Sequence, residues 1–278
     1  MTIRSRVRST VVVAAVAFQA IPAPARADEA MAGLRAAQMM FYNGRYADAS
    51  AATTDLCQAD VAALAACELR TSAILFQLRR AIGDPPDKDK AFKQCDACGA
   101  LFATFVEEIR QAQAVARAQL ETHPGDEDTL FFLGKLDLNY VWLQLGTLGR
   151  KTGLEEYREA RRSLDAVLKR NPGHVRAKVA RAWIDYIVDT KMPFGTKWLL
   201  GGGNKKRGLQ AVRDAADMDA DLFVRAEAVF ALWDMQVREK NMAGAVQTAR
   251  RLAADFPENA EVRTFLDTHA QTTVAGKP

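Results

Sequence analysis

Prolines recur at a fixed distance after apolar residues that have helical spacing. This recurrence limits the possible folds of the chain more than any other feature of the sequence. The pattern is an alanine, mostly apolar residues four and seven positions after it, and a proline twelve positions after it. It occurs at Ala160-Leu164-Val167-Pro172, at Ala245-Ala249-Leu252-Pro257 and, less regularly, at Ala112-Ala116-Gln119-Pro124. The first three positions share one face of an α-helix, and proline cannot continue a helix. The chain is therefore predicted to be a series of helices that end at regular points.

Apolar residues recur at helical spacing through the rest of the chain, and no segment alternates as a convincing strand does. Helices are predicted over residues 29–43, 47–57, 61–81, 87–121, 126–148, 155–170, 221–239, 243–255 and 259–269. Residues 174–212 are predicted to hold two more helices, separated by an apolar, glycine-rich and basic insert at 192–203. A kink near Gly99 is the alternative to one long helix over 87–121. The sequence predicts an all-α fold.

The N-terminus has the features of an export signal. Arginines precede an apolar run from Val11 to Ile21, and a small-x-small site ends at Ala27. The run is shorter than the roughly 20 residues that a membrane-spanning helix needs. We therefore expect a signal peptide at 1–27, a helical domain at 28–270 and a flexible tail at 271–278. The mature protein is expected to be periplasmic or secreted.

The apparent basicity of the chain comes from this export signal. The full sequence has 38 basic and 34 acidic residues, and residues 1–27 contain four arginines and no acid. Removing them leaves 34 charges of each sign, whereas nucleic-acid binding requires a basic face. We therefore expect no nucleic-acid partner.

Four cysteines are an even number in a chain expected to reach an oxidising compartment, which favours disulfides. Cys57 and Cys67 flank a helix connection and are predicted to pair, as are Cys95 and Cys98. The alternative for Cys95-Asp96-Ala97-Cys98 is a thioredoxin-like redox pair, but no strand precedes it as that fold requires. Haem attachment is excluded because Gly99 stands where histidine is needed.

The repeated pattern and the stretch Asn43-Gly44-Arg45-Tyr46-Ala47-Asp48-Ala49 resemble the tetratricopeptide repeat family. The resemblance covers residues 30–257 in about five degenerate units. It implies an α-solenoid of antiparallel helix pairs, here with one enlarged inter-helix loop. It also implies a concave groove, lined by the first helix of each unit, that holds a protein or peptide partner.

Alignment of the units on Gly134, Ala180 and Val229 gives candidate residues for this groove. The six positions are Lys135, Arg181 and Phe230, and, four residues later, Asn139, Asp185 and Asp234. Such ladders of polar side chains could bind a peptide backbone or terminus. The alternative is an ordinary solvated helix face.

The insert is a second candidate contact region. It combines apolar and basic residues at Phe194, Trp198, Leu199, Leu200, Asn204, Lys205, Lys206 and Arg207. Asn204 is expected to cap a helix whose first amides and basic residues could bind an anion. We expect the 192–207 loop either to contact a membrane surface, a lipid head group or a partner, or to fold back over the groove.

The sequence contains no pattern that predicts catalysis. Its three histidines, His123, His174 and His269, lack metal-ligand spacing, and no nucleophile motif is present. Asp185 and Asp189 lie one helical turn apart without a second acid–base group. We expect no enzyme activity, metal or cofactor. The predicted function is a periplasmic adaptor or ligand-binding scaffold, and the alternative is a helical carrier of an apolar or lipid ligand in an envelope transport system.

Overall fold

The computed structural model describes residues 23–58, 63–192, 195, 197 and 200–269, and these contain helices and no strand. The helices are α1 (Ala23–Tyr42), α2 (Tyr46–Ala52), α3 (Thr54–Cys57), α4 (Ala63–Ile82), α5 (Lys88–Lys93), α6 (Cys98–Thr122), α7 (Glu127–Val141), α8 (Leu154–Arg170), α9 (Val175–Lys191), α10 (Lys205–Ala216), α11 (Leu222–Arg238), α12 (Met242–Asp255) and α13 (Ala260–His269). A π-helical segment, η1 (Trp142–Thr147), extends α7. The predicted all-α class is confirmed.

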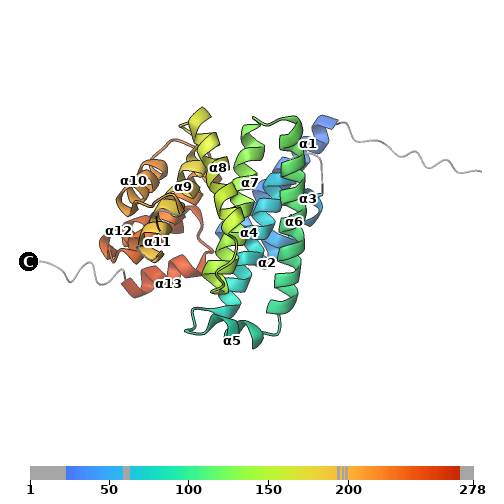
Figure 1. Ribbon diagram of the computed structural model, residues 1–278. Helices are drawn as coiled ribbons and strands as arrows, with labels where there is room; N and C mark the ends of the chain where they lie inside the picture. The colour runs from blue at the N-terminus through green and yellow to red at the C-terminus, as the bar shows by residue number, and fades with distance from the viewer. Residues whose placement is uncertain (1–22, 59–62, 193–194, 196, 198–199, 270–278) are drawn as a thin grey trace, which may run out of the picture.

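Consecutive helices pack as neighbouring pairs, most extensively α7 with α8 and α9 with α10 (Figure 1). Small residues allow these close approaches. A Cβ atom on Gly134 would lie 3.0 Å from Leu164 Cγ, and one on Gly208 would lie 2.7 Å from the Ala182 carbonyl oxygen. A larger side chain at either position would therefore push the two helices of a pair apart.

The single long helix expected over 87–121 is wrong, because the chain breaks between α5 and α6 at residues 94–97. The Asp87 side chain caps α5 by accepting the Lys90 N–H. The chain then turns through a backbone hydrogen bond from Cys98 N to Cys95 O of 3.1 Å. The alternative of a kink near Gly99 was closer to the observed break. Figure 1 places α5 across one end of α4 and α6.

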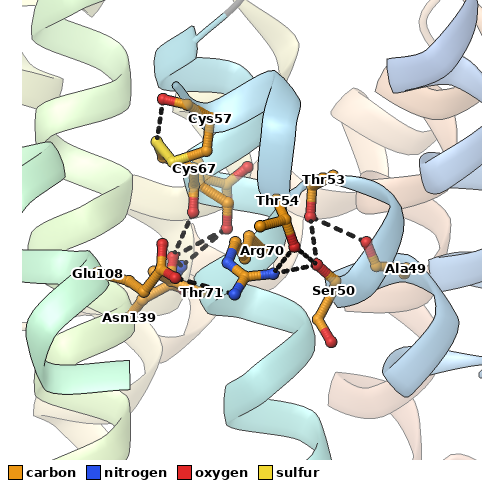
Figure 2. Close-up of a disulfide and its surroundings, with 11 residues drawn as sticks. Ala49, Ser50, Thr53, Thr54, Cys57, Cys67, Arg70, Thr71, Glu108 and Asn139 are labelled. Carbon is orange, nitrogen blue, oxygen red and sulfur yellow. Dashed lines mark hydrogen bonds and ion pairs between the residues drawn. A yellow bond between two sulfur atoms is a disulfide. The ribbon is translucent and has the colours of Figure 1, made fainter. Parts of the chain in front are cut away.

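Both predicted disulfides are confirmed. Cys57 pairs with Cys67, and Cys95 pairs with Cys98, with Cα–Cα distances of 4.8 and 5.3 Å. Figure 2 shows the first bond above a polar junction between α2, α3, α4 and α6. There Arg70 donates to Thr54 Oγ1 at 2.7 Å and pairs with Glu108 at 2.9 Å. Together, this disulfide and Arg70 fasten α2 and α3 to α4.

The C-terminal end of α1 meets α11 and the turn after α12 at Tyr42. Its ring lies 6.1, 5.5 and 5.2 Å from the rings of Phe223, Phe230 and Phe256. Two hydrogen bonds join the following turn to the turn after α12: Asn259 Nδ2 donates to Tyr42 O at 2.8 Å, and Glu258 N donates to Asn43 Oδ1 at 3.0 Å. The first helix is thereby held against the last three.

The expected signal peptide and tail fall largely outside the described part of the chain, which begins at Ala23 in α1 and ends at His269. Within that part, α1 runs through the predicted cleavage site near Ala27. None of the described helices combines the length and the apolar character needed to cross a bilayer.

The contact between the end of α1 and the C-terminal helices can be tested at Tyr42. Tyr42→Ala should lower the free energy of unfolding by roughly 3 kcal/mol in urea titrations, because it removes an aromatic side chain from three ring contacts. Tyr42→Phe loses only the hydrogen bond to Phe223 O of 3.3 Å and should cost less than about 1 kcal/mol. Exposed Met39 supplies the control, since Met39→Ala should change stability by no more than about 0.5 kcal/mol. Equal effects of the three substitutions would contradict this contact.

Candidate functional site

Four charged side chains from four helices meet near the centre of the molecule, and we call them the central ion cluster: Glu68 of α4, Lys135 of α7, Arg176 of α9 and Glu227 of α11. Lys135 Nζ lies 2.5 Å from Glu227 and 3.6 Å from Glu68. Arg176 lies 2.5 Å from Glu227 and 2.9 Å from Glu68. Each cation therefore contacts both carboxylates, and the cluster is neutral.

Burial makes these ion pairs mutually dependent. The side chain of Glu68 is 5 % exposed, and those of the other three are 15–18 % exposed. Burial opposes ionisation of Glu227, but Lys135 and Arg176 outweigh it and lower the Glu227 pKa to about 2. Burial likewise disfavours the Arg176 cation, but the two glutamates raise its pKa above the ordinary value. Arg176 also lies 4.8 Å above the Phe131 ring.

Three of the six candidate groove residues lie at or beside this centre. Lys135 belongs to the central ion cluster. Asn139 is buried between α4 and α7, where its Nδ2 donates to Ser72 Oγ at 2.9 Å and Thr71 Oγ1 at 3.1 Å. Phe230 stacks on Tyr42. These side chains join helices to one another and are enclosed by them.

The other three candidates lie elsewhere. Arg181 donates to Asp165 and Asp185, both at 2.7 Å, at the junction of α8 and α9. Asp185 is buried and also binds Arg207 of α10. Asp234 pairs with Arg238 on the same helix at 2.9 Å. The structure therefore does not bring the six residues into one ladder.

The alignment failed because it assumed the same rotation for every first helix. On α9 the residue that reaches the centre is Arg176, and Arg181 lies five residues further on, which turns it to a different face. Glu68, Arg176 and Glu227 were not predicted from the sequence to form a group. Their only local signal was a charge inside a mainly apolar helical segment, such as Glu68 in α4.

The 192–207 loop is tied to α8 and α9 at its described end. The carbonyl oxygen of Leu200 accepts from Tyr157 Oη at 2.8 Å and from Arg161, which also donates to Gly201 O at 2.7 Å. Lys197 Nζ lies 2.8 Å from Asp189 Oδ1. Phe194, Trp198 and Leu199 lie outside the described residues, so the structure does not place the apolar part of the insert.

Asn204 caps α10 as predicted, accepting from Arg207 N at 2.9 Å. The anion near this helix end comes from the chain itself, since Asp189 Oδ2 accepts from Lys205 N at 2.9 Å. Lys205 Nζ pairs with Glu239 at 2.8 Å, and Arg207 pairs with Asp185 at 2.8 Å. Lys206 is exposed on the same turn. Much of the predicted anion site is therefore occupied by internal partners.

An open cleft lies where the turn after α1 and the end of α4 meet α11 and α13, and we call it the terminal cleft. Its volume is about 740 Å³. It is lined by Asn43, Gly44, Arg45, Arg80, Trp233, Glu258, Ala260, Glu261, Thr264, Phe265, Thr268 and His269. A second hollow of about 450 Å³ shares Gly44, Arg45 and Arg80 with it. Both border the Asn43–Ala49 stretch that the sequence analysis singled out.

Ion pairs and aromatic rings form the walls of the terminal cleft. Arg80 donates to Gly44 O at 3.0 Å and to Glu261 at 2.9 Å, and its guanidinium lies 4.6 Å above the Tyr46 ring. Trp233 and Phe265 meet edge to face at 5.4 Å. The cleft thus offers an aromatic surface between paired charges of both signs.

A buried carboxyl group lies between α6, α7 and α8. The side chain of Asp137 is fully buried and accepts from Gln113 Nε2 at 2.7 Å. Burial raises the Asp137 pKa to about 8, and nearby Glu159 adds to the rise while Arg117 opposes it. Arg117 Nη2 lies 2.5 Å from Glu159 and 3.8 Å from Asp137. Asp137 is therefore mainly protonated at neutral pH.

No protein-family model, curated protein or solved structure matches this chain. Within the described residues, no group of three or more histidine, cysteine, aspartate or glutamate side chains is arranged to hold a metal ion.

Glu227→Gln tests the central ion cluster. At pH 7 it should lower the free energy of unfolding by roughly 3 kcal/mol, because two buried cations are left with one carboxylate. The folded-state pKa of about 2 lies below the ordinary 4.5, so the stability from Glu227 is complete above pH 4.5 and is lost as pH falls towards 2. Urea titrations should therefore show a smaller difference from wild type at pH 3. The exposed pair provides the control: Asp234→Asn should cost less than about 0.5 kcal/mol.

Asp137→Asn tests the buried acid and has the opposite pH dependence. The folded-state pKa of about 8 lies above the ordinary 3.8. The contribution of Asp137 to the free energy of unfolding is therefore complete below pH 3.8 and is lost as pH rises through 8. Asparagine removes this loss, so the variant should be more stable than wild type at pH 9 by at least roughly 1 kcal/mol. Thermal unfolding between pH 4 and 9 measures the difference, with exposed Asp219→Asn as the control. A constant difference across this range would contradict a protonated Asp137.

Proposed function

We propose that this protein is an exported, tetratricopeptide-like helical adaptor that binds a protein or peptide partner at the terminal cleft. The observation that carries the proposal is the contrast between two surfaces. Lys135 and Asn139, expected to line a groove, are engaged by neighbouring helices, whereas the terminal cleft is open. Binding at the cleft requires no buried ion pair to break.

Export and the repeat architecture are parts of the same proposal. The arginine-rich, apolar N-terminal sequence supports export, and two disulfides suit an oxidising compartment such as the periplasm. The pairing of consecutive helices and the recurring proline pattern support a solenoid of degenerate repeats. We assign the partner contact to the cleft rather than to the 192–207 loop, since Lys205 and Arg207 pair within the chain.

The walls of the terminal cleft indicate the chemistry of the partner. Aromatic side chains such as Trp233 and Phe265 bind apolar side chains well when surrounding polar groups exclude water. The paired charges at Arg80–Glu261 and Arg45–Glu258 form such a polar rim, with N–O distances of 2.9 and 4.0 Å. We therefore expect a partner segment that inserts an apolar side chain and flanks it with polar residues.

Blocking the cleft tests the proposal. Thr264 and Asp267 are both exposed on α13, but only Thr264 lines the cleft. Thr264→Trp should fill the cleft and raise the partner Kd at least about tenfold, which corresponds to about 1.4 kcal/mol of binding free energy. Asp267→Trp should leave the Kd unchanged.

The partner is first identified with a photo-crosslinking residue at position 264, which should give one discrete adduct in envelope extracts. Binding of the purified pair is then measured by calorimetry.

Two outcomes would overturn the proposal. The first is an equal loss of binding for Thr264→Trp and Asp267→Trp. The second is stoichiometric lipid extracted from the purified protein together with no discrete adduct, which would favour the carrier of an apolar ligand instead.

A further inference from the structure

Neither cysteine of the Cys95–Cys98 disulfide lines the terminal cleft, and the bond takes no part in the proposed function. It closes the turn between α5 and α6, with Cys95 half-buried and Cys98 fully buried as the first residue of α6. Cys95 is therefore the more accessible residue of the pair, although it also packs against the apolar core beside α6. The same bond also lies at the start of a helix of 25 residues.

The fold around this bond is held by contacts that do not involve sulfur. Hydrogen bonds from Cys95 N to Phe92 O and from Cys98 N to Cys95 O, of 3.2 and 3.1 Å, form the turn. Lys88 Nζ donates to Gly146 O at 2.7 Å, and Arg150 pairs with Asp89 at 3.6 Å, so α5 is tied to the end of η1. No residue of α5 is buried. Reduction of the bond should therefore leave the fold intact.

The second disulfide shares the asymmetry of burial, with Cys57 half-buried and Cys67 buried, but it closes a longer loop. Cys57 and Cys67 are ten residues apart, against three for Cys95 and Cys98. Closing a longer loop restricts the unfolded chain more and so stabilises the bond more. Cys67 lies within α4, beside the Arg70 junction (Figure 2). This bond serves as an internal reference for a structural disulfide.

We propose that Cys95 and Cys98 form a redox-active pair that exchanges with a dithiol on another protein. A thiolate of the substrate attacks Cys95 Sγ, the Cys95–Cys98 bond breaks, and its electron pair remains on Cys98 Sγ. The second substrate thiolate then attacks the sulfur of the first, and Cys95 leaves as a thiolate. The substrate becomes a disulfide, and two electrons and two protons pass to Cys95 and Cys98.

Burial among apolar side chains disfavours a thiolate on Cys98, and the position of Cys98 at the start of α6 offsets this cost. A thiolate that departs at the first residue of α6 lies at the positive end of the helix dipole, near amide groups without partners inside the helix. A better-stabilised leaving thiolate speeds exchange. Because Cys95 is the more accessible residue, the attack is directed to Cys95 Sγ, and Cys98 Sγ is the leaving thiolate.

Titration of the full mature protein in glutathione redox buffers tests the proposal. Trapped thiols are alkylated and assigned to each cysteine by mass spectrometry. The Cys95–Cys98 bond should be at least about 100-fold easier to reduce than Cys57–Cys67, without a change in the circular dichroism spectrum. Equal reduction of the two bonds, or reduction of Cys95–Cys98 only in denaturant, would show that the bond is structural.

Single-cysteine variants test the order of attack. Cys98→Ser should form a mixed disulfide with glutathione at Cys95, at least about tenfold faster than Cys95→Ser does at Cys98. Both variants should keep the wild-type circular dichroism spectrum, which separates reactivity from misfolding. Equal rates at the two positions would overturn the assigned roles. Binding at the terminal cleft should be the same in all these variants, so the two proposals can fail separately.

Discussion

The arrangement of the helices depends on the central ion cluster. A charge removed from water without a partner is strongly destabilising, so Glu68, Lys135, Arg176 and Glu227 must meet once they are buried. They come from α4, α7, α9 and α11, and both cations contact both carboxylates. Rotating one helix would leave buried charge unpaired. The cluster therefore fixes the rotation of four helices at once.

The cluster also shapes what the molecule can bind. Side chains that could meet a ligand on the inner helix faces instead satisfy one another, as Asn139 does with Ser72 and Thr71. The end of α1 is held to α11 and to the turn after α12 by Tyr42 and by the Asn43 and Asn259 hydrogen bonds. The terminal cleft is built from these same parts of the chain, so its shape depends on that contact.

Local sequence cues predicted the helices and both disulfides. Periodic apolar residues, helix-ending prolines and the Asn204 cap act within one or two turns, so they can be recognised without the rest of the chain. Cys57 and Cys67 lie close in sequence across a chain reversal, as do Cys95 and Cys98. The break at residues 94–97 was harder to predict, because no proline or glycine lies within it.

The sequence by itself determined the helical class and most of the approximate helix boundaries, and it favoured the pairing of neighbouring cysteines that the structure then showed. Only the tertiary structure decided which residues face the centre. Arg176 rather than Arg181 joins Lys135, and Asp189 rather than an external anion meets the start of α10. The physical reason is the 3.6-residue period of the helix, which fixes the faces of one helix relative to one another. The rotation of that helix against its neighbours is set by packing and charge pairing between residues far apart in sequence.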